Sequence, residues 1–266
     1  VMEKWNACSG GWWPVVSHEQ LERELEGREC VVGLDLSTTT DLTAALCVFP
    51  RVLNADEEGY PAEADICGEN ASIVIPGFEY GDPLKWHDVL SYFWCPADGI
   101  LQRSKKDRVP YDIWAKDGFL QETEGNAVDH QAIRIANNDL AQRYQVREIA
   151  ADAWNAHKIL TELANDDGFV VARIRQGFLS LSAPTKELDT LYIRRAIRHA
   201  GHPVLKWCAN NAALEKDAAD NWKPSKKKSR ERIDGITALV TALARLIVEE
   251  TTNYGEPIQV IGRAEG

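Results

Sequence analysis

The sequence predicts an α/β protein in which a mixed β-sheet is flanked by helices. Near the start, the apolar runs VVGLDL and TAALCVF are separated by the polar turn STTTD, which is typical of an antiparallel hairpin. Later, strand-like and helix-like segments alternate, as they do where helices join parallel strands. With 266 residues, 44% of them hydrophobic, the chain is long enough to bury one substantial core.

The first part of the sheet is predicted to be a three-stranded antiparallel meander. Its strands are expected at 31–36, at 43–49 and, after an acidic loop, at 71–78. A short helix should precede it, with Ser17 as its N-cap and Gln20 completing a capping box. The segment 84–125 is too rich in proline, glycine and charge to assign.

The second part is predicted to alternate between helices and parallel strands. Apolar residues at helical spacing, such as Ile159, Leu160 and Leu163, mark the helices, and short apolar runs mark the strands. Gly201 is expected to be the C-cap of the penultimate helix. The expected elements are a helix at 129–144, a strand at 145–152, a helix at 154–168, a strand at 169–174, and helices at 184–201 and 233–250.

Composition and charge exclude several classes of protein. No apolar run approaches the roughly 20 residues that span a bilayer, and the first residues lack the order of a secretory signal, so we expect an intracellular protein without a membrane span. The net charge of -11 argues against binding nucleic acid by bulk charge alone. The six cysteines form no C-x-x-C pair, so we expect reduced thiols and no zinc site.

Three aspartates stand where a carboxylate could serve chemistry. Asp35 interrupts the first apolar strand, Asp152 ends a predicted parallel strand, and Asp234 lies at the start of the last helix. A buried carboxylate is costly unless it is paired or binds a cation, and the carboxyl ends of strands are where open α/β sheets place their sites. Each also has a structural explanation: a hairpin hydrogen bond for Asp35, an N-cap for Asp152 and a favourable helix start for Asp234.

Taken together, the three aspartates favour a metal site. Mg²⁺ and Mn²⁺ prefer oxygen ligands, and three carboxylates can bind two such ions. One ion activates a water molecule, and the other stabilises the leaving oxygen of a phosphodiester. Carboxylates on the first strand, a later parallel strand and a C-terminal helix resemble the arrangement of ribonuclease H-like nucleases.

A narrower resemblance rests on several blocks of sequence in order. GLDLSTTTDLTA, EIAADAWNAHKILTEL and the stretches 109–133 and 199–246 resemble the C-terminal nuclease domain of the large terminase subunit of tailed bacteriophages, of the HK97-like type. The resemblance implies a ribonuclease H-like fold and a metal-dependent endonuclease that cuts concatemeric double-stranded viral DNA during packaging. It places Asp35, Asp152 and Asp234 on the family's metal-binding acids.

The resemblance also implies partners and a domain organisation. Large terminases carry a packaging ATPase, but the sequence contains no G-x-x-x-x-G-K-[ST] motif. We therefore expect a lead-in from a missing ATPase domain at 1–30, the nuclease domain at 31–250 and a C-terminal tail at 251–266. The expected partners are double-stranded DNA, the portal protein, the small terminase subunit and the ATPase domain. The isolated domain is expected to be a monomer acting in the host cell cytoplasm.

A basic stretch just before Asp234 is predicted to contact DNA, although a solvated loop would have the same composition. Its cations are Lys223, Lys226, Lys227, Lys228, Arg230 and Arg232.

Three further residues are weaker candidates for the site. Asp41 could be an outer acid or a turn residue, and Glu231 could help to bind a second metal or form an ion pair. His157 could face the site and transfer a proton. Two other functions stay open: a non-catalytic docking module of the packaging motor, and a resolvase-like nuclease of the same fold. Metal-dependent nicking and a preference for branched DNA would separate them.

Overall fold

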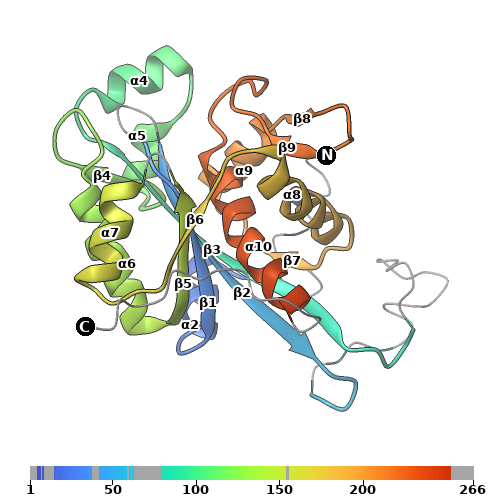
Figure 1. Ribbon diagram of the computed structural model, residues 1–266. Helices are drawn as coiled ribbons and strands as arrows, with labels where there is room; N and C mark the ends of the chain where they lie inside the picture. Colours follow the sequence, from blue (N-terminus) through green and yellow to red (C-terminus); the bar gives the residue numbers. More distant parts are fainter. Residues whose placement is uncertain are drawn as a thin grey trace.

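A single mixed β-sheet carries the fold of the computed structural model (Figure 1). The structure describes residues 5–6, 8, 15–37, 42–58, 60, 62, 79–153 and 156–252, without the side chains of 249–252. Within these residues the strand order is β4-β3-β2-β1-β5-β6, β7 pairs with β3, and β8 and β9 form a separate two-stranded sheet. The strands are β1 Glu29–Asp35, β2 Thr43–Leu53, β3 Leu84–Pro96, β4 Gln121–Thr123, β5 Gln145–Asp152, β6 Val171–Ile174, β7 Ile197–Arg198, β8 Leu214–Lys216 and β9 Trp222–Pro224.

The predicted antiparallel hairpin is confirmed, and a different strand extends it. β1 pairs antiparallel with β2, and β2 pairs antiparallel with β3 over its whole length. The third strand predicted at 71–78 lies outside the described residues. β3 lies in the segment that the sequence left unassigned. Most of its residues are buried whichever face they point to, so it lacks the alternation that identifies a half-exposed strand.

The parallel half of the sheet agrees with the sequence. β5 pairs parallel with β1, and β6 pairs parallel with β5. The carboxyl ends of β1 and β5 therefore lie side by side, and these ends carry Asp35 and Asp152.

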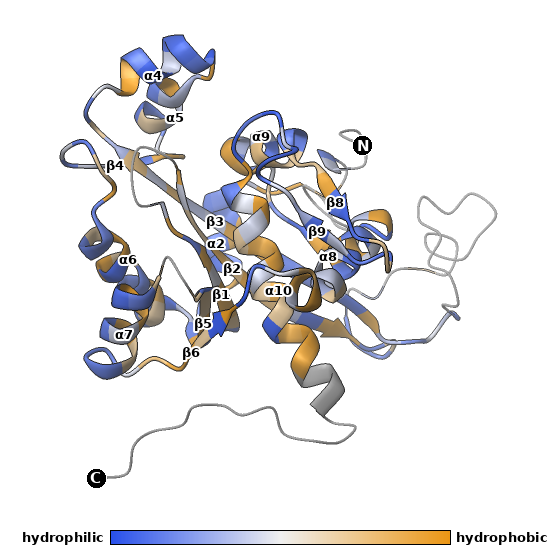
Figure 2. Ribbon diagram, turned by 45° about the horizontal axis from the view of Figure 1, so that its top comes forward, coloured by the Kyte–Doolittle hydropathy of each residue, from blue (hydrophilic) through white to orange (hydrophobic). Residues whose placement is uncertain are grey.

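Helices cover both faces of the sheet, and Figure 1 shows α6 and α7 on one side with α8, α9 and α10 on the other. Leu21 of α2, Ile133 of α6 and Leu160 of α7 pack in one apolar cluster, and the apolar stripe of α10 packs in another. Figure 2 shows polar residues on the outer faces of α6 and α7. The helices are α2 His18–Glu24, α4 Ile100–Asp107, α5 Tyr111–Lys116, α6 His130–Arg143, α7 His157–Asn165, α8 Phe178–Ile193, α9 Pro203–Asn211 and α10 Asp234–Thr252.

The capping box of α2 is confirmed: the Ser17 hydroxyl accepts from the Gln20 amide, and the Gln20 side chain accepts from the Ser17 amide. Since Leu21 and Leu25 are fully buried, α2 packs as part of the core. The described cysteines are buried free thiols, and Cys67 lies outside the described residues. None of the described helices is both long and apolar enough to cross a bilayer.

The helix predicted at 184–201 is wrong at both ends. α8 begins at Phe178, so Pro184 lies inside it, where buried Leu181 and Leu188 hold the helix against the core. It ends at Ile193, and after a turn at Arg194 and Arg195 the chain joins the sheet as β7, which pairs with His87 and Asp88 of β3. Gly201 is therefore no C-cap.

The close approach of α10 to the sheet requires a glycine on β1. A Cβ atom on Gly33 would lie 2.0 Å from the carbonyl oxygen of Ala238 and 2.8 Å from the amide nitrogen of Ala242. Both are helix backbone atoms, so no side chain could move aside to make room.

Gly33→Ala should therefore destabilise the domain strongly. We expect the free energy of unfolding to fall by about 3 kcal/mol or more, because α10 must move off β1. Urea denaturation measures the change. Gly177→Ala is the matched control, since nothing lies within 4 Å of a Cβ there. A Gly33→Ala variant as stable as this control would contradict the packing described.

Candidate metal and nucleic-acid site

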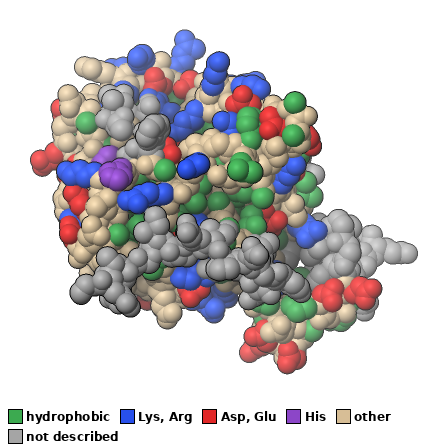
Figure 3. All heavy atoms as spheres, viewed as in Figure 1, with side chains coloured by type: hydrophobic (Ala, Val, Ile, Leu, Met, Phe, Trp, Pro, Cys, Tyr) green, Lys and Arg blue, Asp and Glu red, His purple; other side chains and the backbone are tan. Residues whose placement is uncertain are grey.

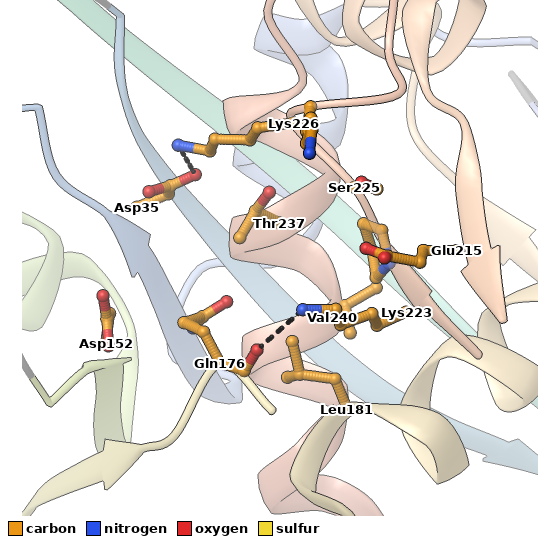
Figure 4. A pocket seen from close by; sticks show the side chains of 12 residues that line it. Asp35, Asp152, Gln176, Leu181, Glu215, Lys223, Ser225, Lys226, Thr237 and Val240 are labelled. Atoms are coloured by element: carbon orange, nitrogen blue, oxygen red, sulfur yellow. Dashed lines mark hydrogen bonds and ion pairs between the residues drawn. The ribbon is translucent and has the colours of Figure 1, made fainter. Parts of the chain in front are cut away.

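A cavity of about 410 Å³ lies where β1 and β5 end. Figure 4 shows Asp35 and Asp152 on the side of the main sheet, and Glu215 and Lys223 on the side of the small sheet β8-β9. Thr237 and Val240 of α10 also line it. The ends of β1 and β5, one face of α10 and the small sheet thus meet at this cavity, whereas Asp234, at the start of α10, is not among the residues that line it.

Asp35 is held in the interior by the alternation of β1. Its side chain shares a strand face with Val31 and Gly33, the face on which α10 packs, and its relative exposure is 6%. Asp234 is the first residue of α10 and is 4% exposed. Because α10 packs closely on β1, these two buried carboxylates lie near each other.

Lys226 connects the two acids. Its Nζ lies 2.8 Å from Oδ2 of Asp35 and 2.7 Å from Oδ1 of Asp234. Lys226 comes from the segment between β9 and α10, and 56% of its side chain is exposed while both carboxylates are buried. The ammonium group therefore reaches from the surface into the acid pair.

Burial and neighbouring charges shift the pKa values of Asp35 and Lys226. Burial, followed by the negative charge of Asp234, raises the pKa of Asp35 to about 7, although the positive charge of Lys226 opposes the shift. Burial lowers the pKa of Lys226, but the two carboxylates outweigh it, and that pKa lies above its ordinary value. Lys226 is charged at neutral pH, so one positive charge faces two acids.

The residues present suit a hard divalent cation. Oδ2 of Asp234 is buried and accepts no hydrogen bond from the described residues. This carboxylate oxygen could therefore coordinate a metal ion. Asp152 lines the same cavity across from Lys226 (Figure 4). Among the described residues, no group of three or more His, Cys, Asp or Glu side chains lies close enough together to hold a metal ion. The assignment of Asp35, Asp152 and Asp234 as metal ligands stays a prediction.

The structure divides the basic stretch between different partners. Besides Lys226, two of its cations are engaged: Lys223 Nζ donates to the carbonyl of Gln176 at 3.4 Å, and Arg232 binds Oδ2 of Asp107 at 2.9 Å. Lys227, Lys228 and Arg230 are exposed, and Lys227 lines the cavity.

The weaker candidates lie apart from the cavity or outside the described residues. Asp41 belongs to the latter. Glu231 is exposed, precedes α10, and contributes its charge near Tyr111. His157 is the exposed first residue of α7. Neither Glu231 nor His157 lines the cavity.

Sequence reasoning missed four polar residues that line the cavity: Gln176, Glu215, Ser225 and Thr237. Thr237 lies one helical turn after Asp234, a spacing that the sequence could have shown, and its hydroxyl donates to the carbonyl of Ile233 at 3.4 Å. Gln176 lies between β6 and α8, and no local pattern marks it.

The mixed sheet and its acidic strand ends define a ribonuclease H-like domain. The sequence model of the family "Terminase large subunit, endonuclease domain" matches residues 84–250. The chain belongs to this family of terminase large subunit endonuclease domains.

Individual relatives agree with this assignment. The chain is 30% identical over 231 residues to the large terminase subunit of Enterobacteria phage HK97, covering 86% of this chain and 40% of the relative. It is 24% identical to protein YmfN of Escherichia coli (strain K12), covering 92% and 50%. The crystal structure of the HK97 bacteriophage large terminase superposes with a TM-score of 0.65 at 28% identity, covering 87% of this chain and 43% of that one. The chain thus spans half or less of these relatives.

The pKa of Asp35 predicts how stability depends on pH. Its folded pKa of about 7 lies above that of an unfolded aspartate, so the folded state binds the proton more tightly. The ionisation of Asp35 therefore destabilises the domain progressively between about pH 4 and pH 7, and fully above that range.

Asp35→Asn should relieve this cost. In EDTA at pH 8 we expect the variant to be more stable than the parent by about 1 to 3 kcal/mol, and at pH 4 the gain should vanish. Urea denaturation across this pH range measures it, with exposed Asp139→Asn as the control. A gain that is independent of pH would show that the charge of Asp35 is not its cause.

Proposed function

We propose that the domain is a divalent-metal-dependent endonuclease that cuts concatemeric double-stranded viral DNA during genome packaging. The observation that carries the proposal is the convergence of Asp35 and Asp152 on one cavity, with Asp234 joined to Asp35 through Lys226. Membership of the terminase endonuclease family supports it.

In this proposal each aspartate has a defined part. Asp35, Asp152 and Asp234 would hold Mg²⁺ or Mn²⁺, two ions in all, because these metals prefer carboxylate oxygens. When bound, the ions supply an activated water and stabilise the leaving oxygen of the phosphodiester. Thr237 and Val240 of α10 line the cavity that holds Asp35 and Asp152, and Val240 gives it an apolar wall.

The DNA backbone would lie on a cationic surface beside the cavity. Figure 3 shows Lys and Arg side chains across the top of the molecule, from α4 to the segment before α10. The ion pair of Arg232 with Asp107 and its 2.5 Å contact with the Tyr111 hydroxyl join these two regions. We define the cationic surface as the exposed residues Lys105, Lys106, Arg108, Lys227, Lys228 and Arg230.

The proposal extends to the partners and the location of the domain. The portal protein, the small terminase subunit and the terminase ATPase domain are the proposed partners, and the host cell cytoplasm is the proposed location. The isolated domain is proposed to be a monomer.

Asp152→Asn tests the endonuclease proposal. The change removes a negative ligand and almost no volume, so the fold should persist while nicking of supercoiled plasmid in Mg²⁺ or Mn²⁺ falls at least about 100-fold. Asp139→Asn, an equal change on the exposed face of α6, should nick at the parent rate.

Parent activity in EDTA, or an Asp152→Asn variant that nicks as fast as the parent, would refute the assignment. No nicking by the folded parent in either metal would favour a docking module instead. A strong preference for branched over linear duplex would favour the resolvase-like alternative.

Charge reversal tests the cationic surface. Lys227→Glu with Lys228→Glu, and separately Lys105→Glu with Lys106→Glu, should each weaken binding of a short duplex about tenfold and shallow its salt dependence. Lys226 is left unchanged because it contacts the acids. Fluorescence anisotropy across a salt titration measures both effects.

The control is Lys85→Glu with Lys158→Glu, which makes the same change of charge on exposed residues of β3 and α7. If this control weakens binding as much as the test pairs, net charge and not the cationic surface would explain the loss.

A further inference from the structure

Lys226 occupies the place that a cation bridging Asp35 and Asp234 would take. Its ammonium contacts one oxygen of each carboxylate, at 2.8 and 2.7 Å. A divalent ion such as Mg²⁺ binds carboxylate oxygens at roughly 2.0 to 2.1 Å. A bridging ion would therefore need the same oxygens from almost the same position, and two cations so close together in a buried site repel strongly.

The ammonium compensates the acid pair only in part. It brings one positive charge to two carboxylates, and Oδ2 of Asp234 accepts no hydrogen bond from the described residues. A divalent ion offers twice the charge and can coordinate oxygens that Lys226 leaves without a partner. Lys226 thus holds Asp35 and Asp234 together, and the two carboxylates still attract a cation of higher charge.

The backbone on both sides of Lys226 is anchored, so exchange requires only side-chain movement. The amide of Ser225 donates to the carbonyl of Ala213 at 2.9 Å, and the hydroxyl of Ser229 donates to the carbonyl of Ser225 at 2.7 Å. The Ser229 hydroxyl also accepts from the amide of Ala213 at 3.0 Å. A lysine side chain on this fixed base has four rotatable bonds and is already half exposed.

We propose that Lys226 is a positioning residue that holds Asp35 and Asp234 together, that a divalent ion displaces it, and that its ammonium then binds a DNA phosphate. We expect the displaced ammonium to bind a phosphate because Lys226 and Lys227 line the same cavity as Asp35 and Asp152. Lys226 thereby couples metal binding to DNA binding. The proposal rests on the proposed function for its choice of ligands.

Metal titration tests the first half. Lys226→Met and Lys226→Gln both remove the charge, and the Gln variant keeps a polar donor in case Met alone fails to fold. Titration calorimetry with Mn²⁺ and no DNA should show about tenfold tighter binding in both variants, because the competing cation is gone. Their melting temperatures in EDTA should fall and should rise more than the parent's on adding Mn²⁺.

Two controls separate charge competition from a general structural effect. Lys226→Arg keeps the charge, and Lys228→Met removes an exposed cation two residues along, so both should bind Mn²⁺ within about threefold of the parent. Parent-like or weaker Mn²⁺ binding by Lys226→Met and Lys226→Gln would overturn the proposal. Because calorimetry involves no cleavage, this result is independent of whether the domain cuts DNA.

Duplex binding tests the second half. In EDTA, Lys226→Met should bind a short duplex like the parent, because the acids engage Lys226 there. With Ca²⁺ added it should bind about threefold more weakly than the parent, since the displaced ammonium is missing. Lys228→Met should be weaker under both conditions. Equal weakening of Lys226→Met with and without Ca²⁺ would overturn the coupling.

Discussion

The packing of α10 directly on β1 is the contact on which the site depends. Gly33 lets the helix backbone at Ala238 approach the strand more closely than any side chain would permit. Asp35, two residues further along the same strand face, is thereby brought beside Asp234 at the helix start. A larger separation would leave two isolated buried carboxylates, each with an uncompensated cost of burial.

This arrangement places opposite charges at different depths. The acids lie in the interior, where burial raises the pKa of Asp35, and the cations of α4 and of the segment before α10 lie on the surface. In the proposed function, a chain with a net charge of -11 would thus bind a divalent cation at its buried acids and a phosphate backbone at its surface cations. Lys226 connects the surface cations with the buried acids, because much of its side chain is exposed while its ammonium contacts both carboxylates.

The parts of the fold that the sequence predicted are those whose apolar residues form an uninterrupted run or recur at helical spacing. β1, β2 and β5 are short apolar runs bounded by polar turns, α6 and α10 carry apolar residues at helical spacing, and Asp35, Asp152 and Asp234 could be assigned to the ends of three of these elements. β3 was missed because polar residues such as His87, Asp88 and Ser91 interrupt its apolar run, and the start of α8 was missed because packing of Leu181 and Leu188 overrides the expectation that a helix starts at Pro184. The contacts of Lys226 with the two acids could not be predicted, because Lys226 lies in an irregular segment. In such a segment, spacing along the chain does not tell how far apart two residues lie in space.

The position of that single ammonium depends on elements far apart in the sequence. The amide of Trp222 in β9 donates to the hydroxyl of Ser182 in α8, which fixes the small sheet against the helix layer. Ser225 then continues from β9 and bonds to Ala213 just before β8. Lys226 follows on this support and meets an acid from β1 and an acid from α10. Its geometry is therefore a property of the assembled fold, which explains why a basic stretch resembling a solvated loop contains a residue bound to two buried carboxylates.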